Sequence, residues 1–544
     1  MATLDYRTPQ TVQPGHTFLG HPIGLFLLFL VEMWERFSYY GMRALLVLYL
    51  VSPTSGMHNP PAGVAPGFNP GRGWTDASAS TLYGWYTGLA YLLPIFGGII
   101  ADKLIGTHRS MIVGALLISL GHVTLAISGM GSLGQNDLGM SIFIMGLALI
   151  VLGTGHFKPT VSVMVGQLYA PEDPRREGAF SIFYMGINLG AFLCAFVCGT
   201  LGERVGWHWG FGAAAVGMLA GLLLYSIGRP KFLAGIGEPP AGMPNIAPYF
   251  ILASIVLSAA FAFLYHWQAF SSLGKLMQTA ATSKFSVGQL AVGAISMAVI
   301  ALAVWFVIIQ QPGDRGPVTA IFLFMFFNVF FWIAFEQAGS SINLFTDRFT
   351  QRQLGSWTVP TTWFQSANPL MIITLAPIFG ATWVGLARRN LNPSQPAKIA
   401  LGLIFLGIGY LFITWGAIST KAGVPGVTSA AKASMLFILA TYLFHTMGEL
   451  CLSPTGLSFV TRVAPVRFVS LLMGIWFISS FIANLCGGLI AARVEAIEKG
   501  EVSLPWHIGG QADFFMLFVV SSLGAGFLVL IFTPLLKRLI AGRE

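Results

Sequence analysis

The sequence predicts an all-α polytopic membrane protein with about fourteen spanning helices. Hydrophobic residues make up 55% of the 544 residues and charged residues only 9%, whereas soluble domains carry about a quarter charged residues. The mean hydropathy of +0.74 points the same way. A spanning helix needs roughly 20 apolar residues, so the chain is long enough for a dozen or more of them.

The predicted spans are apolar segments bounded by Gly, Pro and clusters of charge. An even number of spans places both termini on the same side of the membrane. Lys and Arg are more frequent in the loops on that side, which predicts that both termini are cytoplasmic. The spans cover residues 22–50, 79–103, 110–130, 140–169, 178–201, 210–228, 247–268, 287–311, 318–345, 362–387, 397–419, 433–462, 469–493 and 513–541.

The charge pattern favours a lipid bilayer and excludes nucleic acid as a partner. The formal net charge is +9, but Lys and Arg stand singly or in pairs between apolar segments, like loop charges that set membrane orientation. The first apolar stretch, residues 21–51, is too long for a signal peptide. Four cysteines within apolar segments are interpreted as packing residues rather than as disulfides or metal ligands: Cys194, Cys198, Cys451 and Cys486.

The loop after the second span indicates the fold family. Residues 98–109 read GIIADKLIGTHR, which resembles the loop signature of the major facilitator superfamily. Such proteins have two six-helix halves, so fourteen spans leave two extra helices, at 247–268 and 287–311. The predicted organisation is a cytoplasmic segment (1–21), a first six-helix bundle (22–230), a linker with the two extra helices (231–317) and a second six-helix bundle (318–544).

Seven ionisable residues lie inside predicted spans. A charged side chain at bilayer depth costs several kcal/mol, so such residues are rare and usually line a pathway. Four are acids and three are bases, which leaves one carboxylate without a full partner when all are charged. A buried carboxylate in that position tends to take up a proton, as a proton-coupled carrier requires. The seven are Glu32, Glu35, Arg36, Arg43, Lys158, Glu336 and Glu449.

The first span concentrates these charges on one face. At about 100° per residue, Glu32, Glu35, Arg36, Tyr39 and Arg43 fall within one sector of the helix, with Tyr40 at its edge. A single polar stripe on an apolar helix predicts a water-filled cavity beside it. The alternative is a structural ladder in which Glu32 pairs with Arg36 at i,i+4.

Several sequence blocks together resemble one family, the proton-dependent oligopeptide transporters of the major facilitator superfamily. Residues 32–40 resemble its ExxERFxYY signature and residues 183–190 its FYxxINxG block. Similar blocks occur in both halves, in the expected order, so the resemblance covers essentially the whole chain: residues 155–159, 335–337, 368–369 and 448–454.

The resemblance implies a proton-coupled symporter that imports di- and tripeptides across the bacterial inner membrane by alternating access, as a functional monomer without a cofactor. The peptide carboxylate would face the basic residues Arg43 and Lys158, and its amine the acids of the second half. The implied substrate contacts are Arg43, Tyr40, Tyr91, Lys158, Tyr184, Asn188, Trp332, Asn368, Glu449, Ser453 and Trp476. The implied proton-coupling residues are Glu32, Glu35, Arg36, Glu336 and Glu449.

Some alternatives stay open at this point. Animal members of the family carry a proton-handling histidine in the second span; none occurs here between Trp74 and Lys103, so coupling must rest on carboxylates. The substrate can also be another small peptide-like or anionic solute. A drug/proton antiporter is disfavoured, because such exporters resemble one another in a Gly/Pro-rich block in the fifth span and the fifth span here contains no proline. An enzyme is not expected, since the sequence has no zinc-protease motif, nucleophile elbow or P-loop.

Overall fold

The computed structural model describes residues 17–57, 60, 64–65, 67–170, 172–239, 242–268, 287–427, 431–465 and 468–540, without the side chains of 287–293, 295–296, 453–458, 461 and 470. Within that part of the chain, 11 helical stretches are long and apolar enough to cross a membrane. One of them, Asp76–Ile127, contains two predicted spans, and every predicted span coincides with a helix. The all-α polytopic architecture is confirmed.

The first half contains six long helical runs. The polypeptide turns sharply at Gly106, whose φ of +79° suits glycine, and this turn separates the second run from the third. The fifth run continues through a short π-helical segment. The elements are α1 (Ile23–Val51), α2 (Asp76–Ile100), η1 (Ala101–Ile105), α3 (Gly106–Ile127), η2 (Gly131–Gln135), α4 (Asp137–Gln167), α5 (Arg175–Cys194), η3 (Ala195–Gly199), α6 (Thr200–Arg204) and α7 (Trp207–Phe232).

The second half repeats this pattern with six more runs, two of which begin or continue in 3₁₀ geometry. The elements are α11 (Pro312–Phe335), η4 (Glu336–Gly339), α12 (Ser341–Phe349), η5 (Thr361–Ser366), α13 (Ala367–Arg388), α14 (Gln395–Thr420), α15 (Met435–Val463), α16 (Val469–Ala491), α17 (Val494–Glu498) and α18 (Gln511–Ile540). The break at η4 falls at Glu336, one of the charges predicted at membrane depth.

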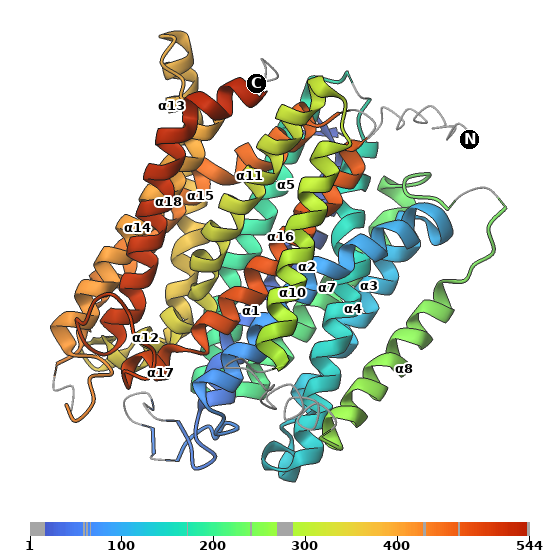
Figure 1. Ribbon diagram of the computed structural model, residues 1–544. Coiled ribbons are helices and arrows are strands. Elements are labelled where there is room, and N and C mark those ends of the chain that lie inside the picture. Colours follow the sequence, from blue (N-terminus) through green and yellow to red (C-terminus); the bar gives the residue numbers. More distant parts are fainter. Residues whose placement is uncertain are drawn as a thin grey trace.

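Two further helices lie between the halves in sequence, α8 (Ala247–His266) and α10 (Val287–Ile308). α8 packs against α3 and α4 and stands at the outside of the molecule in Figure 1. Much of its apolar surface is exposed, including Leu252 and Phe263, as expected of a helix that faces lipid. The exact domain boundaries remain a prediction.

The described strands are two-residue pairs in the loops. β1 (Thr17–Phe18) pairs antiparallel with β2 (His21–Pro22), and β4 (Gln353–Leu354) pairs antiparallel with β5 (Trp357–Thr358). β3 (Thr350–Gln351) pairs in parallel with β6 (Ala433–Ser434). These pairs fix the loops but add no sheet to the architecture.

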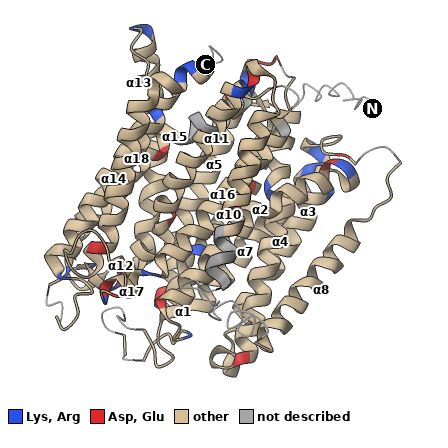
Figure 2. Ribbon diagram, viewed as in Figure 1, with Lys and Arg blue, Asp and Glu red and all other residues tan. Residues whose placement is uncertain are grey.

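The molecule has two ends, named here for use below. At the distal end, at the bottom of Figure 1, α1 and α12 end; at the terminal end, at the top, α18 ends. Figure 2 shows most Lys, Arg, Asp and Glu residues near these two ends and few between them. Charged residues at mid-depth are therefore the exception.

The two halves contact each other through α2 with α16 and through α5 with α13. Two glycines make the first contact close, since a Cβ added to Gly84 would lie 2.9 Å from the Cα of Gly488. Small residues let membrane helices approach in this way. The largest apolar cluster belongs to the second half, around Phe331, Tyr410 and Phe518, and a separate apolar cluster lies within the first half. Each half therefore has its own core.

Candidate functional site

A cavity of about 260 Å³ lies between the two halves. Pockets of this kind usually bind small molecules through apolar walls and a few placed polar groups. Both halves contribute to the wall, which is rich in aromatic residues. The residues predicted from sequence that line it are Tyr40, Arg43, Tyr91, Tyr184 and Asn188 from the first half, and Trp332, Glu336, Asn368 and Glu449 from the second.

One ion pair crosses the cavity wall from half to half. The guanidinium of Arg43, on α1, donates to the carboxylate of Glu336, at the start of η4, and both side chains are buried. Arg43 Nε also donates to the hydroxyl of Tyr83 at 2.5 Å, and the ring of Tyr40 lies 5.7 Å from the guanidinium carbon. The break in α11 places Glu336 where it meets α1.

The other two predicted substrate charges, Lys158 and Glu449, are both described and do not form an ion pair with each other. Lys158 Nζ lies 3.4 Å from the centre of the Tyr91 ring, a cation–π contact. Glu449 accepts a hydrogen bond from Asn368 Nδ2 at 2.9 Å. Each charge is therefore held by a neutral neighbour from its own half.

The polar stripe of α1 forms a compact cluster behind the cavity. Arg36 Nε lies 2.8 Å from a Glu32 oxygen and 2.7 Å from a Glu35 oxygen. All three side chains are buried and none lines the cavity. Among the described residues, neither oxygen of Glu35 has a hydrogen-bond partner. Arg36 is thus the one cation within ion-pair distance of both carboxylates in this cluster. The i,i+4 pair exists, but a second acid is packed against it.

Two predicted substrate residues whose side chains are described, Lys158 and Trp476, do not line the cavity. Trp476 is partly buried against the apolar core of the second half and does not line the cavity. The side chain of Ser453 lies outside the described part of the chain. The roles predicted for all of these residues remain predictions.

Sequence reasoning missed Gln365 and Tyr442, which also line the cavity. Gln365 Nε2 is buried without a hydrogen-bond partner in the part of the chain that the structure describes, and a buried donor of this kind costs free energy unless it donates a hydrogen bond to an acceptor. Gln365 stands three residues before Asn368, close to one helical turn away. The spacing of these two amide side chains at the start of an apolar span was the signal in the sequence that could have identified Gln365.

Comparisons with known proteins agree with the family resemblance found in the sequence. The model of the POT family matches residues 108–506. The chain is 35% identical to the peptide transporter YePEPT of Yersinia enterocolitica, over 90% of this chain and 91% of that protein. It is 33% identical to a di-/tripeptide transporter of Lactococcus lactis, over 96% and 97%. A crystal structure of the peptide transporter POT in complex with sulfate has a TM-score of 0.75 at 33% identity, covering 97% of each chain.

Proposed function

The chain belongs to the POT family of the major facilitator superfamily, and from this premise we propose that it is a proton-coupled symporter that carries di- and tripeptides by alternating access. It is a transporter and not an enzyme. The finer expectations belong to the same proposal: uptake across a bacterial inner membrane, cytoplasmic termini, action as a monomer, and a proton gradient as the driving force without a cofactor.

The observation that carries the proposal is the division of charge across the cavity. The first half contributes the cation Arg43 and the second half the carboxylates Glu336 and Glu449. A peptide at neutral pH has a positive amine at one end and a negative carboxylate at the other. Such a molecule would bind both halves at once, with its amine towards Glu449 and its carboxylate towards Arg43.

The remaining wall suits a carrier of many different peptides. Tyrosine hydroxyls and the amide of Asn188 can hydrogen-bond a peptide backbone without reading its side chains. The aromatic rings of Tyr91, Tyr184 and Trp332 offer apolar surface to side chains of varied size.

Coupling would arise because peptide and proton both compete for the pairs that join the halves. A peptide carboxylate near Arg43 weakens its pair with Glu336, and protonation of a carboxylate does the same. Ligands that bind one facing state better shift the population towards it. In the α1 cluster, the surplus acid of Glu32 and Glu35 is the proposed proton switch.

Purified protein in liposomes tests this function. With dialanine outside and an inward pH gradient, we expect accumulation of dialanine against its own gradient, and loss of that accumulation when a protonophore is added. Exchange of labelled dialanine without a pH gradient should persist. Failure to exchange dialanine, alongside accumulation of a different small anion, would assign another substrate class.

The orientation has a separate test. The segment that contains Lys275 and Lys284 lies outside the described residues, and the predicted topology places it in the periplasm. A single cysteine introduced at position 275 should react with an impermeant maleimide in spheroplasts. Protection there, with labelling only after lysis, would reverse the proposed orientation.

A further inference from the structure

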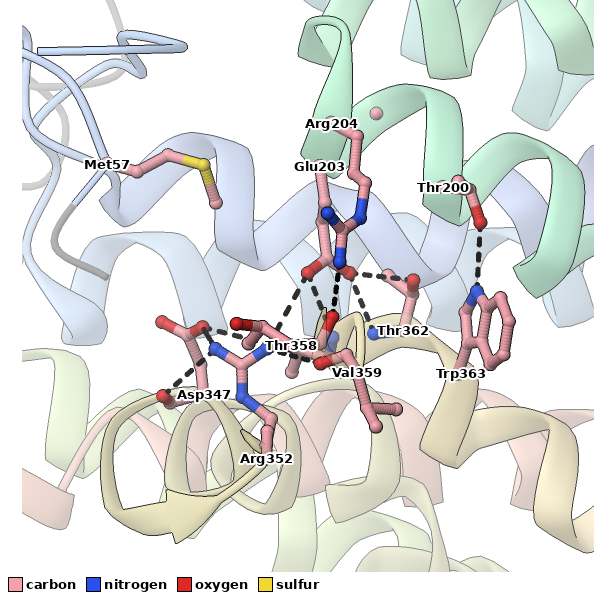
Figure 3. Close-up of polar contacts among 12 residues, drawn as sticks. Met57, Thr200, Glu203, Arg204, Asp347, Arg352, Thr358, Val359, Thr362 and Trp363 are labelled. Atoms are coloured by element: carbon pink, nitrogen blue, oxygen red, sulfur yellow. Dashed lines mark hydrogen bonds and ion pairs between the residues drawn. The ribbon is translucent and has the colours of Figure 1, made fainter. Parts of the chain in front are cut away.

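At the distal end, a carboxylate of the first half is buried against the second half. Glu203, at the end of α6, is only 3% exposed, and its side chain points at the segment where η5 begins (Figure 3). We propose that Glu203, with Arg352, Thr361 and Thr362, forms a distal latch that holds this end closed and is released once in each transport cycle. The proposal rests on the alternating access proposed above.

Three hydrogen bonds run from the second half to the Glu203 carboxylate. The backbone N–H of Thr361 donates to Oε2 at 2.8 Å, and the backbone N–H of Thr362 donates to Oε1 at 2.8 Å. The hydroxyl of Thr362 also donates to Oε1, at 2.7 Å. Hydrogen bonds to an ionised acceptor are about twice as strong as neutral ones. A single side chain therefore joins the two halves through both of its oxygens.

The sequence around η5 explains why its amides need a partner from elsewhere. The first N–H groups of a helix have no acceptor within that helix. The residue before η5 is Pro360, which offers no side-chain cap. Glu203 performs the role of a capping residue, but from the opposite half of the molecule. The cap of η5 is complete only while the distal end is closed.

Arg352 balances the charge of the latch without replacing its hydrogen bonds. Its guanidinium lies 3.9 Å from Glu203 Oε2, while it donates to Val359 O at 2.7 Å and to Asp347 Oδ1 at 2.9 Å. Arg352 is itself buried. These bonds fix the loop from β3 to η5 in the shape that presents the amides of η5 to Glu203.

Neighbouring contacts also join the two halves at the distal end. Arg204 donates to the carbonyl of Thr358, and Trp363 Nε1 donates to Thr200 Oγ1 at 2.9 Å. The halves also approach closely at Gly199, where an added Cβ would lie 2.1 Å from Thr362 Oγ1. Glycine at this position therefore lets Thr362 reach Glu203.

The latch stabilises the closed distal end and can also be released, because water hydrates its polar groups strongly once they separate. Closure replaces water around one carboxylate and two amides by direct hydrogen bonds in a buried site. Glu203→Gln breaks this exchange. A carboxamide offers only one oxygen, and its NH₂ group would face an N–H that it cannot accept. The closed state loses stability, whereas the open, hydrated state is little affected.

Distance measurement between spin labels tests the latch directly. Labels on Leu138 and Leu436, at the distal starts of α4 and α15, are placed where the native side chains are 55% and 71% exposed. The four native cysteines are replaced by alanine. In peptide-free protein in nanodiscs, double electron–electron resonance should show that Glu203→Gln raises the ratio of distal-open to distal-closed molecules by about tenfold, the size expected for losing a hydrogen bond to a buried charge.

Two graded variants and a matched control sharpen the test. Thr362→Val keeps both amides and removes only the hydroxyl donor, so its shift should be smaller and in the same direction. Gly199→Ala should also open the distal end, by pushing Thr362 away. Glu238→Gln makes the same substitution at a pair between the linker and Arg229 of the first half, which does not cross to the second half, and should leave the distances unchanged.

The outcomes separate the latch from the proposed substrate. Distances in Glu203→Gln and Thr362→Val that match those of the unsubstituted background would overturn the latch, even if dialanine transport is normal. A shift towards the open state in a protein that does not carry dialanine would uphold the latch and refute the substrate. If Glu203→Gln fails to fold, as judged by gel filtration, Thr362→Val and Gly199→Ala decide the question by the same criterion.

Discussion

The cavity and the distal latch are both polar regions between the halves, but their polar groups differ in how completely they are hydrogen-bonded. In the latch, the one carboxylate of Glu203 accepts three hydrogen bonds from the opposite half. In the cavity, Gln365 Nε2 has no hydrogen-bond partner among the described residues, and Lys158 lies against the ring of the lining residue Tyr91. Buried polar groups are normally satisfied. The difference indicates that the latch is complete in this state of the protein, whereas the cavity leaves donors and charges for a ligand.

The largest effect is expected at the cavity, where the buried pair of Arg43 and Glu336 joins the two halves. Glu336→Gln leaves the buried guanidinium of Arg43 without its counter-charge, and breaking a buried pair from one side costs roughly 3–5 kcal/mol. Dialanine uptake should fall by about a hundredfold or more, with the protein still monodisperse in detergent.

The control for that variant is Asp76→Asn. The pair of Asp76 with Arg348 also crosses the halves, at 2.6 and 2.8 Å, but its side chains are about a quarter exposed. Exposed pairs contribute roughly 0–1 kcal/mol, so uptake should change little. Equal losses in both variants would mean that the cavity pair has no special role.

A second substitution separates coupling from binding. Glu35 is packed against Arg36 behind the cavity, and its oxygens accept no hydrogen bond from the described residues, so it is the proposed proton carrier. Glu35→Gln cannot ionise, so accumulation driven by a pH gradient should be lost while exchange of dialanine down its gradient persists. Both are measured in the same liposomes, with Glu177→Gln on the exposed start of α5 as the control. Retained accumulation would move the switch to Glu336 or Glu449.

A smaller effect is expected at the unpartnered donor of the cavity. Gln365→Leu preserves the approximate size of the side chain and removes its amide. If Nε2 donates to the bound peptide, the KM for dialanine should rise by about tenfold while the maximal rate changes little, because one hydrogen bond in the bound complex is lost. Gln311→Leu, on the exposed start of α11, should leave both constants unchanged. An unaltered KM in Gln365→Leu would show that the donor faces water rather than substrate.

The smallest effect concerns Glu498, a partly buried carboxylate outside both regions. Burial raises the pKa of Glu498, on α17, from 4.5 to about 7, and its Oε1 has no hydrogen-bond partner among the residues that the structure describes. The folded state therefore binds a proton more tightly than the unfolded state, so stability should fall as pH rises from about 4.5 to 7.

Glu498→Gln removes that dependence. At pH 8 the melting temperature should rise by about 1–2 °C, and at pH 5 it should be nearly unchanged. Glu495→Gln is the matched control, since Glu495 lies on the same short helix and pairs with Lys499 at the surface. A rise at pH 5 as large as that at pH 8 would mean that ionisation of Glu498 has no part in the effect.

The comparison also shows where sequence reasoning succeeded. The fold class and the POT family were predicted from composition, span lengths and the signature blocks, and both are confirmed. Each span is a local property, because about 20 apolar residues in lipid must form a helix to satisfy their own backbone groups. Charges at mid-depth stand out for the same reason, so Arg43, Glu336 and Glu449 were recognised as candidates without any structure.

What the sequence alone did not determine are the contacts between residues far apart along the chain. It predicted that one acid is in surplus, but not that Arg43 pairs with Glu336 or that Lys158 rests on Tyr91. It gave no reason to notice Glu203, which lies at the end of a span where acids are common. Only the packing of one half against the other buries that carboxylate against the amides of η5, because a capping group from 158 residues away depends on tertiary structure and on no local pattern.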